Sequence, residues 1–416
     1  MSNVRTILHV DLNSFFATAE QQANSYLRGK PVGILKAIGR TCVIAASIEA
    51  KNCGVQTGMS VFEAKKLCPR ILLVPADFDK YQDITYRFIN ICQNYSPNCE
   101  VFSLDECFID VTETEKFWSN AFNIAFEIKE RLRTEIGDWI TCSIGVSYNR
   151  LLAKLASAQI KPDGLFWITR DNTYEILDKS NLMDVCGLGW GLYKHLTMLG
   201  IDNFSKLRRC SLQFLRKHFG PYWSVHLYNL SRGIDYSPLI AITEIADAKS
   251  VSRTYTTHRN LYEKEEIRQL IRNLGEEAAA KARLMGLAGR YISLTLRGGE
   301  VSYYGHKTLK TYINDGKRLF DLCCQIAKDW PLGQNRVVRF CGVTLGMLIK
   351  ETYLPNSLFP DERRRLRLIK VVDQVNSRFG NYTLYPATLS GMSIIRPEVN
   401  GYFGDKAYRL KSSHTL

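Results

Sequence analysis

The sequence predicts an α+β protein of several domains, because its periodicity changes along the chain. Strand and helix patterns alternate over the first 168 residues, only helical patterns follow to about residue 236, and mixed patterns return after residue 248. A chain of 416 residues exceeds what one hydrophobic core usually organises, and 45% hydrophobic residues suffice for two to four cores.

The first predicted element is a strand at residues 5–12 (RTILHVDL), where aliphatic residues run together until a polar turn at Asn13. Asp11 therefore lies at a strand end. Short apolar pieces separated by turn residues at 43–79 predict a small module inserted after this strand. A helical pattern follows at 81–96.

The next segment predicts a hairpin with an acidic turn. Residues 100–111 alternate apolar and polar side chains on both sides of Asp105 and Glu106, as two strands joined by a tight turn would. A helix at 117–136, the strand TCSIGVS and a second helix from Arg150 complete an α+β sheet domain.

The rest of the chain divides at a linker. Residues 181–233 show only helical patterns broken by glycines, and 236–248 has no clear period. A strand, a helix at about 263–285, two strands, a helix and a last strand then predict a compact four-stranded α+β module. Within 351–416 we expect the basic helix DERRRLRLIKVVDQVNSRF and partial disorder.

Composition limits the kinds of site. Twelve cysteines without a CxxC pair favour reduced, buried thiols, and seven histidines form no HxH or HExxH cluster, so any metal ion must be held by oxygen. The opening residues fit neither a secretory signal nor a transit peptide, and no apolar stretch approaches membrane-spanning length. We therefore expect a soluble, cytoplasmic protein with no membrane partner.

Net charge indicates the class of partner. A formal charge of +14 and a pI of about 9.2 attract polyanions, which makes nucleic acid the leading candidate. Basic proteins often bind nothing specific, so charge alone leaves this open.

Three carboxylates are the candidate catalytic residues: Asp11, Asp105 and Glu106. Their strand ends can converge on one edge of a sheet, and clustered carboxylates need cations. Oxygen ligands suit Mg²⁺, and two such ions would activate a 3′-hydroxyl and stabilise a leaving pyrophosphate in an in-line displacement. On these residues alone, a merely solvated acidic turn is the favoured alternative.

The chain resembles the catalytic core of the Y-family DNA polymerases in five motifs, in order and spacing: VDLNSFFATAEQ, LRGKPVGI, CVIAASIEAKNCGV, VFSLDECFIDVT and SIGVSYNRLLAKLAS. VCGLGWGLYKHLTMLGI resembles the family's thumb. FLRKHFG, SVSRTYTTH, YYGHKTL and RFGNYTLYPA look most like the UmuC branch, the catalytic subunit of DNA polymerase V, with the DinB type next nearest. The resemblance covers residues 5–390.

The resemblance implies a right-hand polymerase with four domains and a tail. These are a ferredoxin-like palm (1–11 and 81–168), small fingers (12–80), a helical thumb with a helix-hairpin-helix (169–236), a linker (237–247), a four-stranded α+β little finger (248–350) and a C-terminal tail (351–416).

By position, the resemblance makes Asp11, Asp105 and Glu106 the ligands of two Mg²⁺ ions, for which Mn²⁺ can substitute. Leu12 contributes its backbone carbonyl. Phe16 takes the steric-gate position under the sugar, where a flat ring would clash with a ribose 2′-hydroxyl. The alternative is that Phe16 is a core aromatic residue. Alternation along an extended segment would turn one ring of Phe15 and Phe16 to the core and the other to the pocket.

Lys51 and Lys161, in KPDG, stand where the family places its triphosphate-binding basic residues, although surface lysines are usually just solvated. The sequence departs from the common family pattern, which has Thr, Tyr and Arg where this chain has Ala45, Ile48 and Lys51. A lysine supplies a point charge where arginine binds two oxygens in a fixed geometry, so we expect a lower nucleotide affinity than in such relatives.

DNA contacts are expected from the thumb and the little finger. The segment around Gly187 and Gly189 resembles a helix-hairpin-helix, whose glycines let backbone N–H groups approach a phosphate. An ordinary connection between two helices, with glycines as caps, explains the same pattern equally well. Basic residues of the last module are further candidates: Arg253, Arg259, Arg290, Arg297, Lys307 and Lys310.

Residues 355–359 (PNSLF) lie where relatives carry a Gln-Leu-x-Leu-Phe-like peptide for the sliding clamp, and only Leu358 and Phe359 match. A linker with two incidental apolar residues is the alternative. The UmuC resemblance would add a UmuD-like subunit and a recombinase filament as partners, beside primer-template DNA and dNTPs.

The sequence thus predicts a cytoplasmic, nucleoid-associated, template-directed DNA polymerase for error-prone translesion synthesis in an SOS-type damage response. A catalytically dead scaffold that binds DNA and the clamp is the main alternative, which intact carboxylates disfavour. A nucleotide cyclase with a similar palm would need no DNA-gripping thumb.

Overall fold

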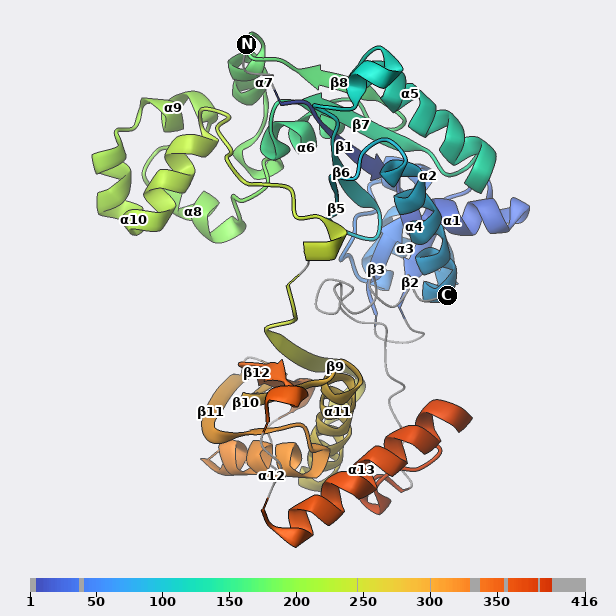
Figure 1. The fold of residues 1–416 in the computed structure, drawn as a ribbon, viewed down its shortest axis with the longest axis vertical. Helices are drawn as coiled ribbons and strands as arrows, with labels where there is room; N and C mark the ends of the chain where they lie inside the picture. The colour runs from blue at the N-terminus through green and yellow to red at the C-terminus, as the bar shows by residue number, and fades with distance from the viewer. Residues whose placement is uncertain are drawn as a thin grey trace. The chain divides into compact units, whose positions relative to one another are not determined.

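The computed structural model describes residues 5–36, 41–244, 246–299, 301–329, 337–354, 358–380 and 382–390. The chain divides into two compact units, residues 1–245 and 246–416, which have separate hydrophobic cores (Figure 1). Among the described residues, no helix combines the length and the apolarity that crossing a membrane requires.

The first unit is built on a five-stranded sheet of order β5-β6-β1-β7-β8. Its strands are β1 (Ile7–Leu12), β5 (Cys99–Val101), β6 (Glu106–Asp110), β7 (Cys142–Ser147) and β8 (Leu165–Ile168). The central strand β1 pairs antiparallel with β6 and β7, and its aliphatic run is fully buried at Ile7, Leu8 and Val10. The predicted first strand, acidic hairpin and TCSIGVS strand are confirmed, whereas β8 was not foreseen.

Three helices cover this sheet: α4 (Phe78–Gln93), α5 (Ala121–Arg131) and α6 (Arg150–Gln159). α6 packs against β1, β7 and β8, α4 against β6, and α5 against β7. Asn120 and Asn149 cap α5 and α6 by accepting hydrogen bonds from backbone N–H groups of the first turn. The helix predicted at 117–136 is shorter as an α-helix, because a 3₁₀ turn precedes it and a π turn at Leu132–Ile136 follows.

A small module lies between β1 and α4 in the sequence. It contains helix α1 (Phe15–Ala23) and a three-stranded sheet of order β3-β2-β4, made of β2 (Val32–Leu35), β3 (Val43–Ala46) and β4 (Leu72–Pro75), with helices α2 (Ile48–Asn52) and α3 (Val61–Leu67). Ser47 and Ser60 cap the two short helices α2 and α3. The predicted small module is therefore confirmed, and it begins earlier, at β2.

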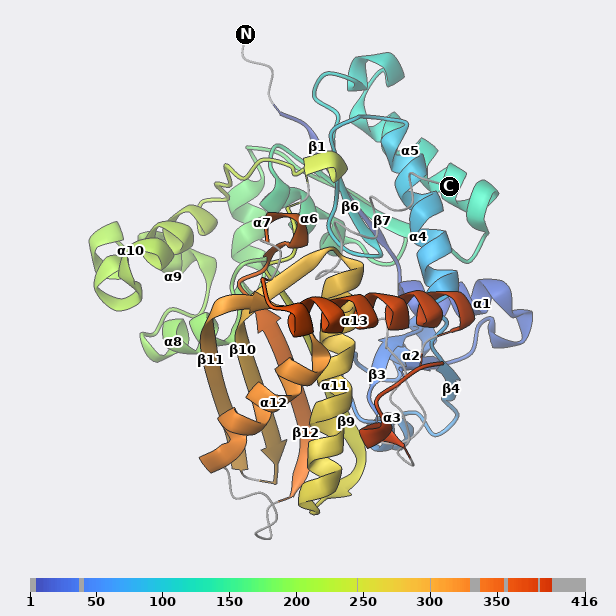
Figure 2. The ribbon, with the colours of Figure 1, turned by 60° about the horizontal axis from the view of Figure 1, so that its bottom comes forward.

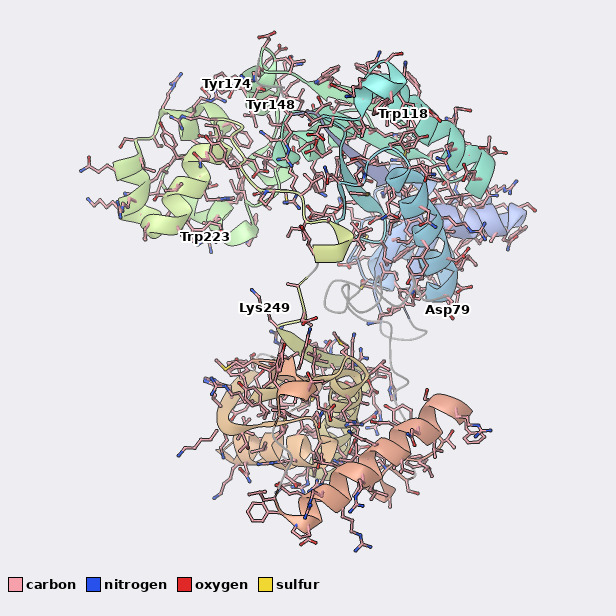
Figure 3. All side chains as sticks on the ribbon, viewed as in Figure 1. Asp79, Trp118, Tyr148, Tyr174, Trp223 and Lys249 are labelled. Carbon is pink, nitrogen blue, oxygen red and sulfur yellow. The ribbon has the colours of Figure 1, made fainter. Side chains whose placement is uncertain are left out.

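After β8 the first unit is helical, as the glycine-broken pattern predicted. Its helices are α7 (Thr173–Lys179), α8 (Trp190–Met198), α9 (Phe204–Arg209) and α10 (Leu212–Leu230). Leu196, Phe204 and Leu227 are fully buried in their shared core. Gly220, with φ +75°, and the following Pro221 break α10, and Trp223 lies beyond this kink (Figure 3).

The second unit has a four-stranded antiparallel sheet of order β11-β10-β12-β9. Its strands are β9 (Ser250–Leu261), β10 (Leu287–Gly298), β11 (Val301–Ile313) and β12 (Val338–Gly346), and β13 (Ile349–Lys350) pairs with β10. Helices α11 (Lys264–Leu284) and α12 (Gly316–Ile326) pack on one face (Figure 2). The predicted four-stranded module is confirmed.

The predicted basic helix is α13 (Pro360–Phe379). Arg283 at the end of α11 donates two hydrogen bonds of 2.6 and 2.7 Å to the carboxylate of Asp373. The guanidinium of Arg365 lies 2.5 Å from the carboxylate of Asp315. Tyr382 then donates a 2.7 Å hydrogen bond to Glu277, so the segment folds back onto α11. The expected partial disorder falls largely on residues 391–416, which lie outside the described residues.

All twelve cysteines have free thiols, as predicted, and seven of them are buried. Burial raises the pKa of the thiols of Cys92 and Cys142, because a buried thiolate loses its hydration. These thiols are therefore packing groups of the first unit's core.

Candidate active site

The three predicted carboxylates lie together at one end of the five-stranded sheet. Asp11 of β1 and Glu106 of β6 are direct partners in the antiparallel register. The backbone N–H of Leu12 donates a 2.9 Å hydrogen bond to the carbonyl of Asp105, which ends the turn between β5 and β6. The strand pairing itself thus brings Asp11, Asp105 and Glu106 to one place.

Two lysines neutralise this carboxylate cluster. Nζ of Lys161 lies 2.7 Å from Oδ2 of Asp11, and Lys154 of α6 forms an ion pair with Glu106. Ser103 donates a 2.5 Å hydrogen bond to Oδ1 of Asp105. Burial raises the pKa of Asp105 and of Glu106, because a carboxylate away from water loses hydration of its charged form. Positive charge nearby therefore stabilises the ionised form of Asp105 and Glu106.

The donor chemistry of this cluster fits a divalent cation. Within the described residues no group of three or more His, Cys, Asp or Glu side chains is arranged to ligate a metal, and Asp11 and Glu106 each form an ion pair with a lysine. The carboxylates of Asp11, Asp105 and Glu106 and the main-chain carbonyl of Leu12 are hard oxygen donors, which Mg²⁺ or Mn²⁺ prefers as ligands. Such a cation would replace the Lys161 ammonium group as the counter-charge of Asp11.

Sequence reasoning missed Lys154 and His9. Nδ1 of the buried His9 lies 2.7 Å from Oγ of Ser157, and its Nε2 lies 4.0 Å from Glu106. Burial, together with Lys154 and Lys161, lowers the pKa of His9 well below its ordinary value, so the ring is neutral. Helical periodicity placed Lys154 one turn after Arg150, but nothing in the sequence showed that this turn faces Glu106.

Phe16 lies in the first turn of α1 and not on an extended segment, so the predicted alternation was wrong. Consecutive helical residues point about 100° apart, which still separates the two rings. Phe15 is buried and Phe16 is half-buried. The Phe16 ring stacks on Tyr81 at 4.3 Å between centroids with 10° between planes, and Tyr81 is held by a 2.8 Å hydrogen bond to Glu20.

Lys51 belongs to α2 and its side chain is exposed. Desolvation lowers the pKa of Lys51, Lys161 lowers it further, and Asp11 and Asp105 oppose this. Ala45 of β3 and Ile48 of α2 are both half-buried in the same small module.

Gly187 and Gly189 precede α8, and their backbone geometry differs. Gly187 has φ +99°, and a Cβ there would lie 2.8 Å from the His226 ring, so a side chain would strain the backbone and require that ring to shift. Gly189 is the N-cap residue of α8, with open space where a Cβ would stand. A cavity of about 710 Å³ adjoins this region, and Phe102, Lys154, Gly187 and Tyr222 are among its lining residues.

The open face of the second unit's sheet is the side away from α11 and α12. Arg297 and Lys310 are exposed there, beside the stacked rings of Tyr291 and His306, which are 5.4 Å apart. Lys307 instead donates to Gln325 of α12 over 3.2 Å. The remaining candidates are Arg259, exposed and ion-paired with Glu266, and Arg290, half-buried beside the Tyr312 ring.

Arg253 is not on the open face. Its side chain points toward α11, is only 7% exposed as a residue, and lies 3.7 Å from the buried Glu277. A guanidinium paired inside the core is not presented to a phosphate, so the structure argues against the predicted DNA contact.

Leu358 and Phe359, the candidate clamp contacts, precede α13 with exposures of 89% and 70%. The preceding residues 355–357 of the predicted peptide lie outside the described residues.

Three family models match the chain. Residues 10–158 match the impB/mucB/samB family, residues 183–235 the DNA polymerase-iota thumb domain, and residues 248–358 the impB/mucB/samB family C-terminal domain.

The chain is similar over nearly its whole length to two bacterial proteins named DNA polymerase IV. The protein of Pelotomaculum thermopropionicum is 34% identical over 396 residues, covering 94% of this chain and 97% of the relative. That of Moorella thermoacetica is 32% identical, covering 94% and 98%. A solved structure titled "Y-family DNA polymerase chimera Dbh-Dpo4(243-245)-Dbh" superposes with a TM-score of 0.72 at 25% identity, covering 83% of this chain and 99% of that chain.

Proposed function

The chain belongs to the impB/mucB/samB family of Y-family DNA polymerases, and from this premise we propose that it performs error-prone translesion synthesis with a two-metal site at Asp11, Asp105 and Glu106. The observation that carries the proposal is the pairing of Asp11 with Glu106 in the sheet register, which holds the acidic turn against the end of β1. It is a DNA polymerase by family, and the roles of individual residues are inferred from this geometry.

Asp11, Asp105 and Glu106, with the carbonyl of Leu12, would hold the divalent cations. When bound, Mg²⁺ would favour the ionised primer 3′-hydroxyl and neutralise charge on the leaving pyrophosphate. Positive charge beside the buried carboxylates would stabilise their ionised form, because burial raises the pKa of Asp105 and Glu106. Lys154 would keep Glu106 oriented through their ion pair.

Lys161 and Lys51 would bind the triphosphate. Lys161 is exposed and contacts Asp11, so an incoming polyanion can recruit its ammonium group once other cations neutralise Asp11. The charges of Lys161, Asp11 and Asp105 also shift the pKa of Lys51. Phe16, fixed by its stack on Tyr81, would present its ring to the sugar and exclude a 2′-hydroxyl.

The two units suggest a division of labour along the chain. We assign the palm to 1–11 and 81–168, the fingers to 12–80, the thumb to 169–236, the linker to 237–247, the little finger to 248–350 and the tail to 351–416. The α8 N-terminus after Gly187 and Gly189 would bind backbone phosphate without reading sequence. Leu358 and Phe359 are exposed as a clamp-binding pair would need to be.

The predicted closeness to the UmuC branch is not confirmed. The relatives carry the name DNA polymerase IV, so the DinB type, weighed as next nearest, fits better. A DinB-like chain acts independently, and the proposal therefore requires no UmuD-like subunit and no recombinase filament. An SOS-type role remains part of the proposal.

Primer extension by the purified full-length chain tests this function. We expect Mg²⁺-dependent extension without partners on an undamaged template and across a template lesion. Extension on undamaged DNA that always stops at the lesion would contradict translesion synthesis. Extension only after adding a UmuD-like subunit and a recombinase filament would instead contradict the DinB assignment.

Pull-down with the sliding clamp tests the tail separately. We expect wild-type protein to be retained and the Leu358→Ala/Phe359→Ala variant to be lost, with unchanged extension of short primers. Equal retention of both proteins would remove this pair from the proposal.

A further inference from the structure

We propose that Lys129 and Asp163 are positioning residues that hold the loop of residues 160–164, which carries Lys161 between α6 and β8, and thereby determine how tightly the site binds the incoming nucleotide. The inference rests on the proposed function, in which Lys161 contacts the triphosphate. Neither residue reaches the carboxylate cluster, so both would act through the loop.

Lys129 is a buried lysine whose partners are carbonyl groups of the loop and of β7. It extends from α5 and is 8% exposed. Its ammonium group donates to the carbonyl of Cys142 over 2.8 Å, of Asp163 over 2.7 Å and of Gly164 over 3.2 Å. These hydrogen bonds use the three N–H donors of the ammonium group, and the Asp163 carboxylate lies beside it as the counter-charge, so Lys129 joins α5, β7 and the loop at one point.

The Asp163 side chain contacts two basic residues at the same place. Its carboxylate lies 2.7 Å from Nζ of Lys129 and 2.6 Å from the guanidinium of Arg133. Asp163 has φ +56°, a left-handed conformation that is uncommon for residues other than glycine but that aspartate adopts more readily than most. Its backbone N–H donates a 2.8 Å hydrogen bond to the side chain of Asn13, two residues after Asp11.

Asn13 connects this loop to the carboxylate cluster. Its side-chain amide donates to Oγ of Ser143 over 3.0 Å, and Ser143 is the register partner of Asp11 on β7. The same Ser143 hydroxyl accepts from the N–H of Gly164 over 3.3 Å. The loop is thus fastened on one side by Asn13 and Ser143 and on the other by Lys129.

The Lys161 side chain makes few polar contacts with the described residues. It is exposed, and its described polar contact is the 2.7 Å pair with Asp11. The position of its ammonium group therefore follows from the backbone of the loop two residues before Asp163. A buried lysine that merely stabilises the fold would affect folding but not nucleotide binding through Lys161, and this distinguishes the two roles.

A double-mutant cycle tests the coupling. Single-turnover incorporation of a correct dNTP is measured for the full-length protein, Lys129→Met, Lys161→Ala and the double variant, with DNA affinity and thermal unfolding measured in parallel. We expect Lys129→Met to raise the half-saturating dNTP concentration roughly ten-fold with unchanged DNA affinity. In the Lys161→Ala background the same change should add less than about two-fold, because the residue it positions is gone.

Two further variants complete the design. Arg131→Met, on the same helix but ion-paired with Glu135, is the matched control and should leave dNTP dependence unchanged. Asp163→Asn should raise the half-saturating concentration about three-fold, and it decides the cycle if Lys129→Met proves unfolded.

The outcomes separate the inference from the function on which it rests. The positioning role is overturned if Lys129→Met has its full ten-fold effect in the Lys161→Ala background. It is also overturned if Lys161→Ala changes the dNTP dependence while Lys129→Met and Asp163→Asn do not. No effect of Lys161→Ala alone instead overturns the proposed triphosphate contact.

Discussion

Both units carry a largely antiparallel sheet with helices packed against it, yet they place charge differently. The first unit concentrates Asp11, Asp105 and Glu106 at the ends of adjacent strands, where burial raises the pKa of Asp105 and Glu106. The second unit spreads Arg297 and Lys310 over the open face of its sheet, in contact with solvent.

This difference separates a site for chemistry from a surface for binding. Charges that are buried and held by strand register interact strongly, so loss of one is costly and effects of neighbours are not additive. Exposed charges are screened by water and salt, so each contributes little and their contributions add. The predictions below use this contrast, from the largest expected effect to the smallest.

The carboxylate cluster should show the largest effect. Replacing both Asp105 and Glu106 with Ala should reduce primer extension by roughly 10³-fold or more, because the cation site is lost while the strands remain paired. DNA affinity, measured by fluorescence anisotropy, should change little. Retained extension would place the chemistry elsewhere.

Phe16 should control the choice of sugar. Phe16→Ala removes the ring stacked on Tyr81, and we expect the preference for dNTP over the matching ribonucleotide to fall roughly 10²-fold in kcat/KM. Phe15→Ala is the control, since Phe15 is buried and its loss should lower stability without changing sugar preference. Unchanged discrimination in Phe16→Ala would make Phe16 a packing residue.

Arg253 and Arg297 should behave oppositely in the second unit. Arg253→Ala leaves the buried Glu277 without this partner and should lower the free energy of unfolding by about 2 kcal/mol in urea denaturation. Arg297→Ala should leave stability within about 0.5 kcal/mol but reduce the slope of log Kd against log salt by about 1. A loss of stability in Arg297→Ala together with a reduced salt dependence in Arg253→Ala would contradict the contrast between buried and exposed charge.

Lys51 should show the smallest effect, as an increase in affinity. Lys51→Arg replaces a point charge with a planar fork that can grip two phosphate oxygens, so we expect the KM for dNTP to fall about three-fold. Single-nucleotide kinetics with undamaged template measure this directly. An unchanged or higher KM would show that the small module does not present residue 51 to the triphosphate.

Local pattern predicted the elements well, because it reports burial along one strand or helix. The strand ending near Asp11, the acidic hairpin and the four-stranded module all follow from alternation and turn residues. The family resemblance then selected the site residues. Phe16 was placed on an extended segment, although its neighbours Phe15–Ala23 form a helix that begins directly after β1.

Tertiary contacts account for what could not be predicted. Lys154 and Lys129 lie within the two predicted helices, and only packing of α6 and α5 onto the sheet directs them to Glu106 and to the loop carbonyls. Arg253 read as a surface cation in a strand, but its alternation turns it toward α11. Periodicity gives the face of an element without saying which neighbour covers it.

The central claim is that the carboxylates at the end of β1 and β6 form a divalent-cation site for nucleotide transfer. It is tested most directly by the Mg²⁺ dependence of single-nucleotide incorporation for wild type and for Asp11→Asn, which removes one charge without changing size. We predict saturable dependence in wild type, no incorporation with a chelator, and a half-saturating Mg²⁺ concentration raised roughly ten-fold or more in Asp11→Asn. Incorporation that persists with the chelator, or an identical Mg²⁺ dependence in the variant, would contradict it.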